Sequence, residues 1–193
     1  MNKCDSCKSE NRTNLFSIKK YKIVRCLDCN LVYTENPISL SEAKSYYENT
    51  YNGEESALNS CYGSGEHFRT KEVNLRLDKI GKVNSLLDIG CGLGFFIKMA
   101  SNRGIKCVGV DISEKAVEYS TRQGLDVRYG DLLNLNFNRE LFDTITLWAS
   151  IEHLYYPKAT LEKANKLLKP GGLVVVETGN IDSYQARLFR NKW

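Results

Sequence analysis

The sequence predicts an α/β fold, in which a parallel sheet is covered by helices on both faces and preceded by a small cysteine-rich module. The first observation is that short apolar runs alternate with helix-like segments between residues 85 and 178, a pattern typical of parallel sheets with covered faces. The second is a glycine-rich loop directly after the first apolar run. The third is a pair of Cys-x-x-Cys motifs near the N-terminus. A chain of 193 residues can hold one ordinary domain and such a module.

The two Cys-x-x-Cys motifs predict a zinc-ribbon module over residues 1–36. Eighteen residues separate the motifs, which supply Cys4, Cys7, Cys26 and Cys29. Two such turns can complete a tetrahedron of thiolates around one Zn²⁺, and the hairpin-like segment between them has too few apolar residues to fold without a metal. Redox dithiols or incidental cysteines are the alternatives. Because four protein ligands leave no open position on the ion, we expect a structural zinc and no catalysis there.

Charge and composition narrow the partners of the chain. Residues 1–30 contain seven Lys or Arg and three acids, a local net charge of +4 that equals the formal net charge of the whole chain. Four thiolates around Zn²⁺ would lower the local charge to about +2, a weak attraction for nucleic acid. No apolar run approaches the roughly 20 residues of a membrane span, and the N-terminus lacks an apolar secretory signal. We therefore expect a soluble, cytoplasmic protein with no membrane partner, and we favour a small-molecule partner over nucleic acid.

Residues 37–66 form a polar, glycine-bearing segment that we interpret as a linker or a lid. Four tyrosines lie in it, namely Tyr46, Tyr47, Tyr51 and Tyr62. They could cover a bound ligand, or they could pack a connector against the neighbouring domain, which is the interpretation we favour. Ser41 is expected to cap a short helix that runs through Tyr47. A second helix is expected over residues 67–80, with inward side chains from Phe68, Val73, Leu77 and Ile80.

The core domain, residues 67–193, continues with alternating strands and helices. Strands are expected at residues 85–90, 106–111, 125–131, 142–149 and 173–178. Helices are expected at residues 94–103, between an N-cap at Ser113 and a stop at Gly124, and from residue 158 to a Pro-Gly-Gly stop. Ligands of parallel sheets bind at the carboxyl ends of the strands, near the point where the strand order reverses. Residues at those ends are therefore the candidate site.

The glycine-rich loop has the sequence Gly-Cys-Gly-Leu-Gly at residues 90–94. A dinucleotide-binding loop of the form G-x-G-x-x-G would need a glycine where Phe95 stands. A phosphate-binding P-loop would need a lysine that the segment lacks. The loop also follows an acid, Asp88, on the strand itself. These features count against a dinucleotide-binding loop and against a P-loop.

Five motifs occur in order along the core domain. They are D-x-G-x-G-x-G at residues 88–94, the acid Asp111 at the end of the second strand, GDL at 130–132, IEHL at 151–154 and LKPGG at 168–172. In this order they resemble class I S-adenosylmethionine-dependent methyltransferases, over about residues 67–193. The resemblance implies a Rossmann-like sheet and S-adenosylmethionine as cofactor.

The resemblance also assigns cofactor contacts to individual residues. Backbone at Gly90, Cys91, Gly92 and Gly94 would approach the methionine part, and the helix N-terminus near Gly94 favours its carboxylate. Asp111 would accept hydrogen bonds from both ribose hydroxyls, and Ile112 would lie against the adenine. Asp131 would accept from the adenine amino group, with a backbone N–H from Leu132, although Gly-Asp is also ordinary turn chemistry. Asp88 would orient the loop.

The segment after the fourth strand would face the methyl group. It offers Glu152 and His153, a pair that adjoins the acceptor in the small-molecule O-methyltransferases that it resembles. An imidazole suits general-base work near neutral pH, but His153 could equally brace the short helix before Pro157. The expected activity is methyl transfer to a sugar, a glycan precursor or a secondary metabolite. The alternatives are an RNA methyltransferase that uses the ribbon, and a non-catalytic cofactor-binding or scaffold protein.

In methyltransferases of this kind the sheet continues beyond its fifth parallel strand with a helix and an antiparallel strand pair. Here the sequence reaches one helical segment after that strand, so the core resembles a C-terminally truncated one. The strand at residues 173–177 would then be an unprotected apolar edge. We expect self-association, or a completing second chain, at this edge.

Overall fold

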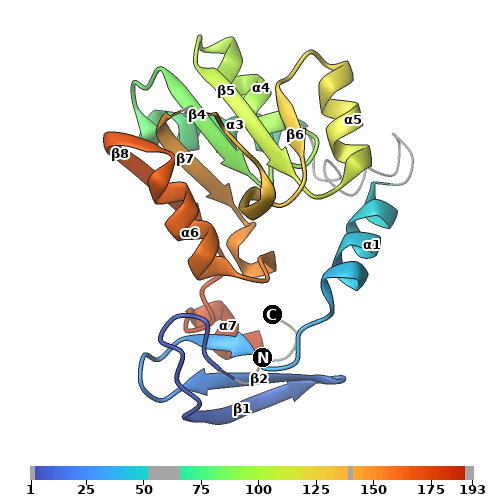
Figure 1. Ribbon diagram of the computed structural model, residues 1–193, viewed down its shortest axis with the longest axis vertical. Helices are drawn as coiled ribbons and strands as arrows, with labels where there is room; N and C mark the ends of the chain where they lie inside the picture. The colour runs from blue at the N-terminus through green and yellow to red at the C-terminus, as the bar shows by residue number, and fades with distance from the viewer. Residues whose placement is uncertain (1–2, 52–65, 139–140, 190–193) are drawn as a thin grey trace.

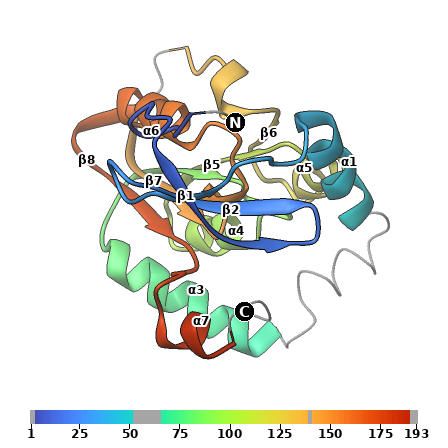
Figure 2. The ribbon, with the colours of Figure 1, turned by 90° about the horizontal axis from the view of Figure 1, so that it is seen from below.

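The computed structural model describes residues 3–51, 66–138 and 141–189. Figure 1 shows a small antiparallel sheet at the N-terminus, a larger sheet layered with helices, and helix α1 standing between them at one side. Strand β7 of the larger sheet points toward the small sheet. Seen from below in Figure 2, the small sheet lies across the core, with α6 on one side and α1 on the other. The N-terminal module therefore lies near the carboxyl ends of the core strands.

The small sheet lies within residues 1–36, where the sequence predicts a zinc ribbon. Its strands are β1 (Arg12–Ile18), β2 (Tyr21–Cys26) and β3 (Val32–Thr34), paired antiparallel in the order β1-β2-β3. Apart from Arg12, every residue of β1 is exposed. The buried apolar residues of the module are Cys4, Val24 and Cys26. So small a core cannot offset the entropy of ordering the chain, which agrees with a fold that depends on a metal.

The larger sheet contains five parallel strands in the order β6-β5-β4-β7-β8. They are β4 (Ser85–Ile89), β5 (Lys106–Asp111), β6 (Val127–Tyr129), β7 (Phe142–Trp148) and β8 (Leu168–Glu177). The chain starts at the central strand β4, builds outward through β5 and β6, and then crosses to β7 on the other side. The strand order thus reverses between β4 and β7, where a ligand of such a sheet binds.

Helices cover both faces of this sheet, which confirms the predicted fold class. They are α3 (Glu66–Ile80), α4 (Phe95–Asn102), α5 (Glu114–Arg122) and α6 (Pro157–Lys166), followed by α7 (Tyr184–Phe189) and by the single 3₁₀ turns η1 (Leu132–Asn134) and η2 (Ile151–His153). One apolar cluster joins α3 and α4 to the sheet, and it includes Val73 and Leu77 as predicted. A second cluster lies on the α6 side, around Ile145 and Leu147. Within the described part of the chain, no helix combines the length and the apolar character needed to cross a membrane.

Two local predictions were wrong. Helix α1 (Leu40–Thr50) is capped by Ser39 and not by Ser41, because Ser39 forms a reciprocal capping box with Glu42. Strand β8 begins at Leu168, so the Pro-Gly-Gly segment belongs to the strand and does not separate it from the helix. An irregular register opposite residues 142–144 accommodates this segment, and proline is tolerated because β8 is an edge strand.

Asp143 joins the starts of three neighbouring strands. Its carboxylate accepts hydrogen bonds from the backbone N–H groups of Asn84 and Ser85, both at 2.8 Å, and from the Lys169 ammonium at 2.8 Å. The Lys169 ammonium, helped by those N–H groups and opposed by desolvation, lowers the pKa of Asp143 to about 2. The ionised form is therefore the form that stabilises the sheet.

We expect Asp143→Ala to lower the free energy of unfolding at pH 7 by about 1 to 2 kcal/mol, because it leaves two N–H groups and an ammonium without their acceptor. Since the folded-state pKa lies below the unfolded value, this contribution is present above about pH 4 and is lost as the pH falls toward 2. Urea titrations of both proteins between pH 7 and pH 3 measure the difference. A difference that stays constant down to pH 3 would contradict this role.

Candidate functional site

The loop between β4 and α4 requires its glycines. Gly90, Gly92 and Gly94 have φ angles of +75°, +53° and +75°, in the left-handed region that side-chain-bearing residues rarely adopt. Gly90 also lacks space, because an added Cβ would lie 2.7 Å from the Ser150 Cβ. At Gly92 an added Cβ would lie 3.1 Å from the Tyr51 hydroxyl oxygen. Backbone, not side chain, therefore forms the surface of this loop.

The loop is tied to the end of β5. The N–H groups of Gly90 and Cys91 donate to the Val110 carbonyl oxygen at 2.8 and 3.1 Å. The Gly92 N–H donates to Asp111 Oδ2 at 2.8 Å. Helix α4 begins directly after the loop, with Gly94 as an N-cap that makes no side-chain hydrogen bond. The positive end of the α4 dipole therefore lies at the loop, where it favours an anionic group.

Asp111 ends β5 and is 8% exposed. Besides the bond from Gly92, it accepts the Ser113 N–H through Oδ1 at 2.9 Å. Desolvation by burial raises the pKa of Asp111, against these backbone donors. Each carboxylate oxygen has a second lone pair, so the side chain can accept further hydrogen bonds from a ligand. Ile112 beside it is half-buried, and Ser113 caps α5 as predicted by accepting the Ala116 N–H.

Asp88 lies behind the loop and is 2% exposed. Thr146 on the adjacent strand donates its hydroxyl to Asp88 Oδ1 at 2.7 Å. Burial raises the pKa of Asp88 to about 7, against the opposing effects of this hydrogen bond and of the Arg76 charge. Thr146, which donates this hydrogen bond, is a partner that the sequence analysis missed, and the part of Asp88 in orienting the loop stays a prediction.

Asp131 follows β6 and takes the turn role that was the alternative in the sequence analysis. Its carboxylate accepts the Leu133 N–H at 2.8 Å and caps the 3₁₀ turn η1. The Leu132 side chain is buried in the core cluster. A contact of this pair with an adenine would therefore use the remaining acceptor capacity of Asp131 and the backbone of Leu132.

The segment after β7 supplies the predicted acceptor residues. Ala149 has a φ of +47°, and Ser150 donates its hydroxyl to the Ile89 carbonyl oxygen at 2.8 Å. The left-handed conformation of Ala149 and the Ser150 hydrogen bond hold the start of η2 beside Gly90. Within η2, both Glu152 and His153 are exposed. The sequence analysis did not single out Ser150. Its position, as a small polar residue shortly after a buried strand, could have marked it as a candidate.

Helix α1 contacts both the cofactor-side and the acceptor-side residues. The Tyr47 and His153 rings meet edge to face with centroids 6.0 Å apart. Glu48 accepts the Glu114 N–H at 2.7 Å and the Ser113 hydroxyl at 3.4 Å. Burial, with the nearby charges of Asp111 and Glu152, raises the pKa of Tyr47. Tyr47 of α1 thus packs against the candidate site, whereas Tyr46 is 64% exposed and contacts the Tyr47 ring.

Tyr62 and the rest of residues 52–65 lie outside the described residues. The side chain of Phe68, which was predicted to point inward, lies outside them as well.

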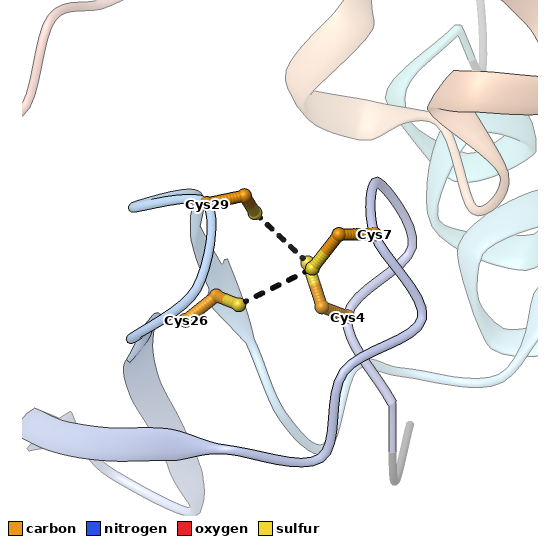
Figure 3. Close-up of side chains that lie close together, drawn as sticks. All are labelled: Cys4, Cys7, Cys26 and Cys29. Atoms are coloured by element: carbon orange, nitrogen blue, oxygen red, sulfur yellow. Dashed lines mark hydrogen bonds between the residues drawn. The ribbon is translucent and has the colours of Figure 1, made fainter.

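The four cysteines of the ribbon converge (Figure 3). Their sulfur atoms all lie within 4.8 Å of one another, with Cys4 to Cys29 and Cys7 to Cys26 both at 3.5 Å. Each Cys-x-x-Cys turn is closed in the same way, by an N–H from Lys8 to the Cys4 carbonyl and from Asn30 to the Cys26 carbonyl. Sulfur ligands at 2.3 Å from one tetrahedral zinc are about 3.8 Å apart. The sulfur positions therefore fit a four-thiolate metal site.

The core matches a known family over residues 65–193, the family described as Methyltransferase domain. The chain is 36% identical over 126 residues to the ubiquinone biosynthesis O-methyltransferase of Caulobacter vibrioides. This alignment covers 58% of this chain and 50% of that protein. It spans about half the length of the curated relatives that it matches first.

Solved structures of similar fold agree with this match. The N-methyltransferase NodS from Bradyrhizobium japonicum, in complex with S-adenosyl-L-homocysteine, aligns with a TM-score of 0.58 at 20% identity over 69% of this chain and 71% of that one. A possible histamine N-methyltransferase from Thermotoga maritima aligns with a TM-score of 0.58 at 25% identity over 76% and 67% of the two chains. The family match extends over most of the chain, and these structures share its layered α/β architecture. The chain therefore belongs to the methyltransferase domain family.

Proposed function

We propose that this chain binds S-adenosylmethionine and transfers its methyl group to a hydroxyl of a small molecule. The observation that carries the proposal is the loop of three positive-φ glycines joined through Gly92 to Asp111, at the edge where the strand order reverses. Backbone there can approach the methionine part, and Asp111 retains lone pairs for the ribose hydroxyls. S-adenosylmethionine, when bound, supplies an activated methyl group on a good leaving group.

The protein has three tasks in such a transfer. The loop and Asp111 fix the cofactor, so that only the acceptor remains to be oriented. His153, exposed in η2, removes the proton of the acceptor hydroxyl. Tyr47 contacts the His153 ring and limits its rotation. We propose that α1 also acts as a lid over the bound ligand. Its residues touch His153 on the acceptor side and the start of α5 on the cofactor side.

The acceptor class is proposed as a hydroxyl-bearing small molecule such as a sugar, a glycan precursor or a secondary metabolite. Support comes from relatives named ubiquinone biosynthesis O-methyltransferase, which marks phenolic hydroxyls as a further class to test. The chain-wide charge of +4 lies in the ribbon, which four metal-bound thiolates would partly neutralise. An RNA acceptor is therefore the weaker alternative.

We further propose that the four cysteines hold one structural zinc. We also propose that residues 1–36, 37–66 and 67–193 are the functional divisions of the chain, and that the protein works in the cytoplasm.

We propose that a second chain pairs with the edge strand β8, because Leu173 and Val176 on this strand are 58% and 39% exposed. Light scattering of the purified chain would give a mass above that of a monomer. A monomer at high concentration would contradict the edge proposal.

A methyl-transfer assay with tritiated S-adenosylmethionine tests the function. The acceptors would be nucleotide sugars, hydroxylated aromatics and total RNA, each offered separately at two salt concentrations. Label on a small-molecule hydroxyl supports the proposal. Label on RNA alone, with steeply salt-dependent binding, would replace it with the RNA alternative. Cofactor binding without transfer to any class would favour a scaffold protein.

A further inference from the structure

Helix α6 begins without a cap of its own. The side chain of its N-cap residue, Tyr156, makes no capping hydrogen bond, and the first helical residue is Pro157. Proline has no N–H, so the first backbone donor of the helix belongs to Lys158. A helix start of this kind needs an acceptor from elsewhere in the molecule.

That acceptor comes from the ribbon, at the other end of the sequence. Asp5 Oδ2 accepts the Lys158 N–H at 2.9 Å. The Lys158 ammonium donates to the Ser6 carbonyl oxygen at 2.7 Å. Asp5 is well covered, with its side chain 11% exposed, and its second oxygen accepts from Lys8 at 2.9 Å. A covered carboxylate at a helix N-terminus also interacts favourably with the helix dipole.

Asp5 stands inside a metal-binding turn. It follows Cys4 directly and precedes Cys7 by two residues. The turn is closed by the Lys8 N–H on the Cys4 carbonyl at 2.8 Å. When Cys4 and Cys7 bind one ion, the two residues between them are held in a single conformation. The metal therefore determines where the Asp5 carboxylate lies.

The capped end of α6 is close in sequence to the acceptor turn. Three residues separate His153, the last residue of η2, from Pro157. Tyr156 is held at this junction, because its carbonyl oxygen accepts both the N–H and the hydroxyl of Thr160 at 3.0 Å. Only residues 154–156 therefore join the first turn of α6 to η2.

We propose that Asp5 is a positioning residue, through which metal binding in the ribbon fixes the first turn of α6 and, with it, the His153 turn. The ribbon then also stabilises the core domain, because its Asp5 carboxylate caps the N-terminus of α6. The coupling to metal rests on the proposed zinc site and the consequence for the acceptor rests on the proposed methyl transfer, whereas the cap itself rests on neither.

Hydrogen exchange at the Lys158 amide tests the proposal on the full zinc-loaded chain, by NMR or by residue-resolved mass spectrometry. The variants are Asp5→Ala and Asp5→Asn, since an asparagine oxygen can still cap a helix. Asp28→Ala is the matched control. Asp28 occupies the second Cys-x-x-Cys turn, where it accepts from Asn11 at 3.3 Å.

We expect Asp5→Ala to accelerate exchange at Lys158 about 5-fold, the loss that corresponds to a missing N-cap. Asp5→Asn should restore most of the protection, and Asp28→Ala should leave it unchanged. Removing zinc with a chelator should accelerate exchange equally in the unmodified chain and should add nothing in Asp5→Ala. This lack of additivity identifies Asp5 as the link between the two sites.

Unchanged protection in zinc-loaded Asp5→Ala would overturn the proposal, as would a chelator effect of full size in that variant. Zinc content is measured in every variant. Should Asp5→Ala lose zinc, Asp5→Asn decides, and exchange as fast as in chelated protein despite bound zinc would contradict the cap. Neither cofactor nor acceptor enters this experiment, so its failure is separate from a failure of the proposed methyl transfer. A chain that holds no zinc would overturn this proposal together with the proposed zinc site.

Discussion

Asp111→Asn is expected to lower the affinity for S-adenosylhomocysteine by about 100-fold. The carboxylate would accept two charge-assisted hydrogen bonds from the ribose, and the loss of both has an effect of this order. The Asp111 carboxylate also accepts the N–H groups of Gly92 and Ser113. In the variant, the amide N–H₂ group would face one of these two donors, so that hydrogen bond would be lost as well. Isothermal titration with S-adenosylhomocysteine measures the change.

Asp126→Asn is the matched control for this substitution. It removes the same charge one strand away, from an acid that faces Arg128 at 3.8 Å and not the glycine loop. The control variant should bind within about 2-fold of the unmodified chain. Binding within 3-fold for a folded Asp111→Asn protein would remove Asp111 from the cofactor site.

His153→Ala is expected to lower methyl transfer by roughly 100-fold, while the affinity for S-adenosylhomocysteine stays nearly unchanged. A general base contributes an effect of this size to the transfer step and little to cofactor binding. The imidazole is exposed, and its ring contact is with Tyr47 of α1. Initial rates at saturating cofactor, with the acceptor found by the panel, provide the measurement.

His67→Ala tests the specificity of that effect, because His67 is the other histidine of the chain. It should keep its turnover. Unchanged turnover in His153→Ala would assign His153 to the structural role that the sequence left open.

The local chemistry of this sequence predicted most of the fold. The positive φ angles at Gly90, Gly92 and Gly94 follow from residues that tolerate them. The cap of α5 by Ser113 follows from one hydroxyl at the right position. Apolar runs between turn signals predicted the five core strands and their positions along the chain.

What the sequence did not predict depends on contacts between distant residues or on a choice between two similar local signals. Ser39 and Ser41 both suit an N-cap, and only Ser39 has a glutamate three positions later. The contact of Asp5 with Lys158 joins residues 153 positions apart, and no local pattern encodes it. The turn role of Asp131 was ambiguous for the same reason, because Asp-initiated turns and ligand contacts use the same carboxylate.

The α1 helix illustrates the same limit. The tyrosines of its segment left a connector and a lid open, and the position of Tyr47 beside His153 and of Glu48 at the start of α5 follows from the tertiary fold. These contacts agree with the connector interpretation, and the lid stays a proposal.

Parallel titrations of the purified chain with S-adenosylhomocysteine and with NAD test the central claim most directly. The geometry of residues 90–94 and of Asp111 predicts one S-adenosylhomocysteine per chain, with a dissociation constant below about 1 mM, and no heat of binding for NAD. Binding of NAD in place of S-adenosylhomocysteine would contradict the claim, since the loop would then hold a pyrophosphate despite Phe95.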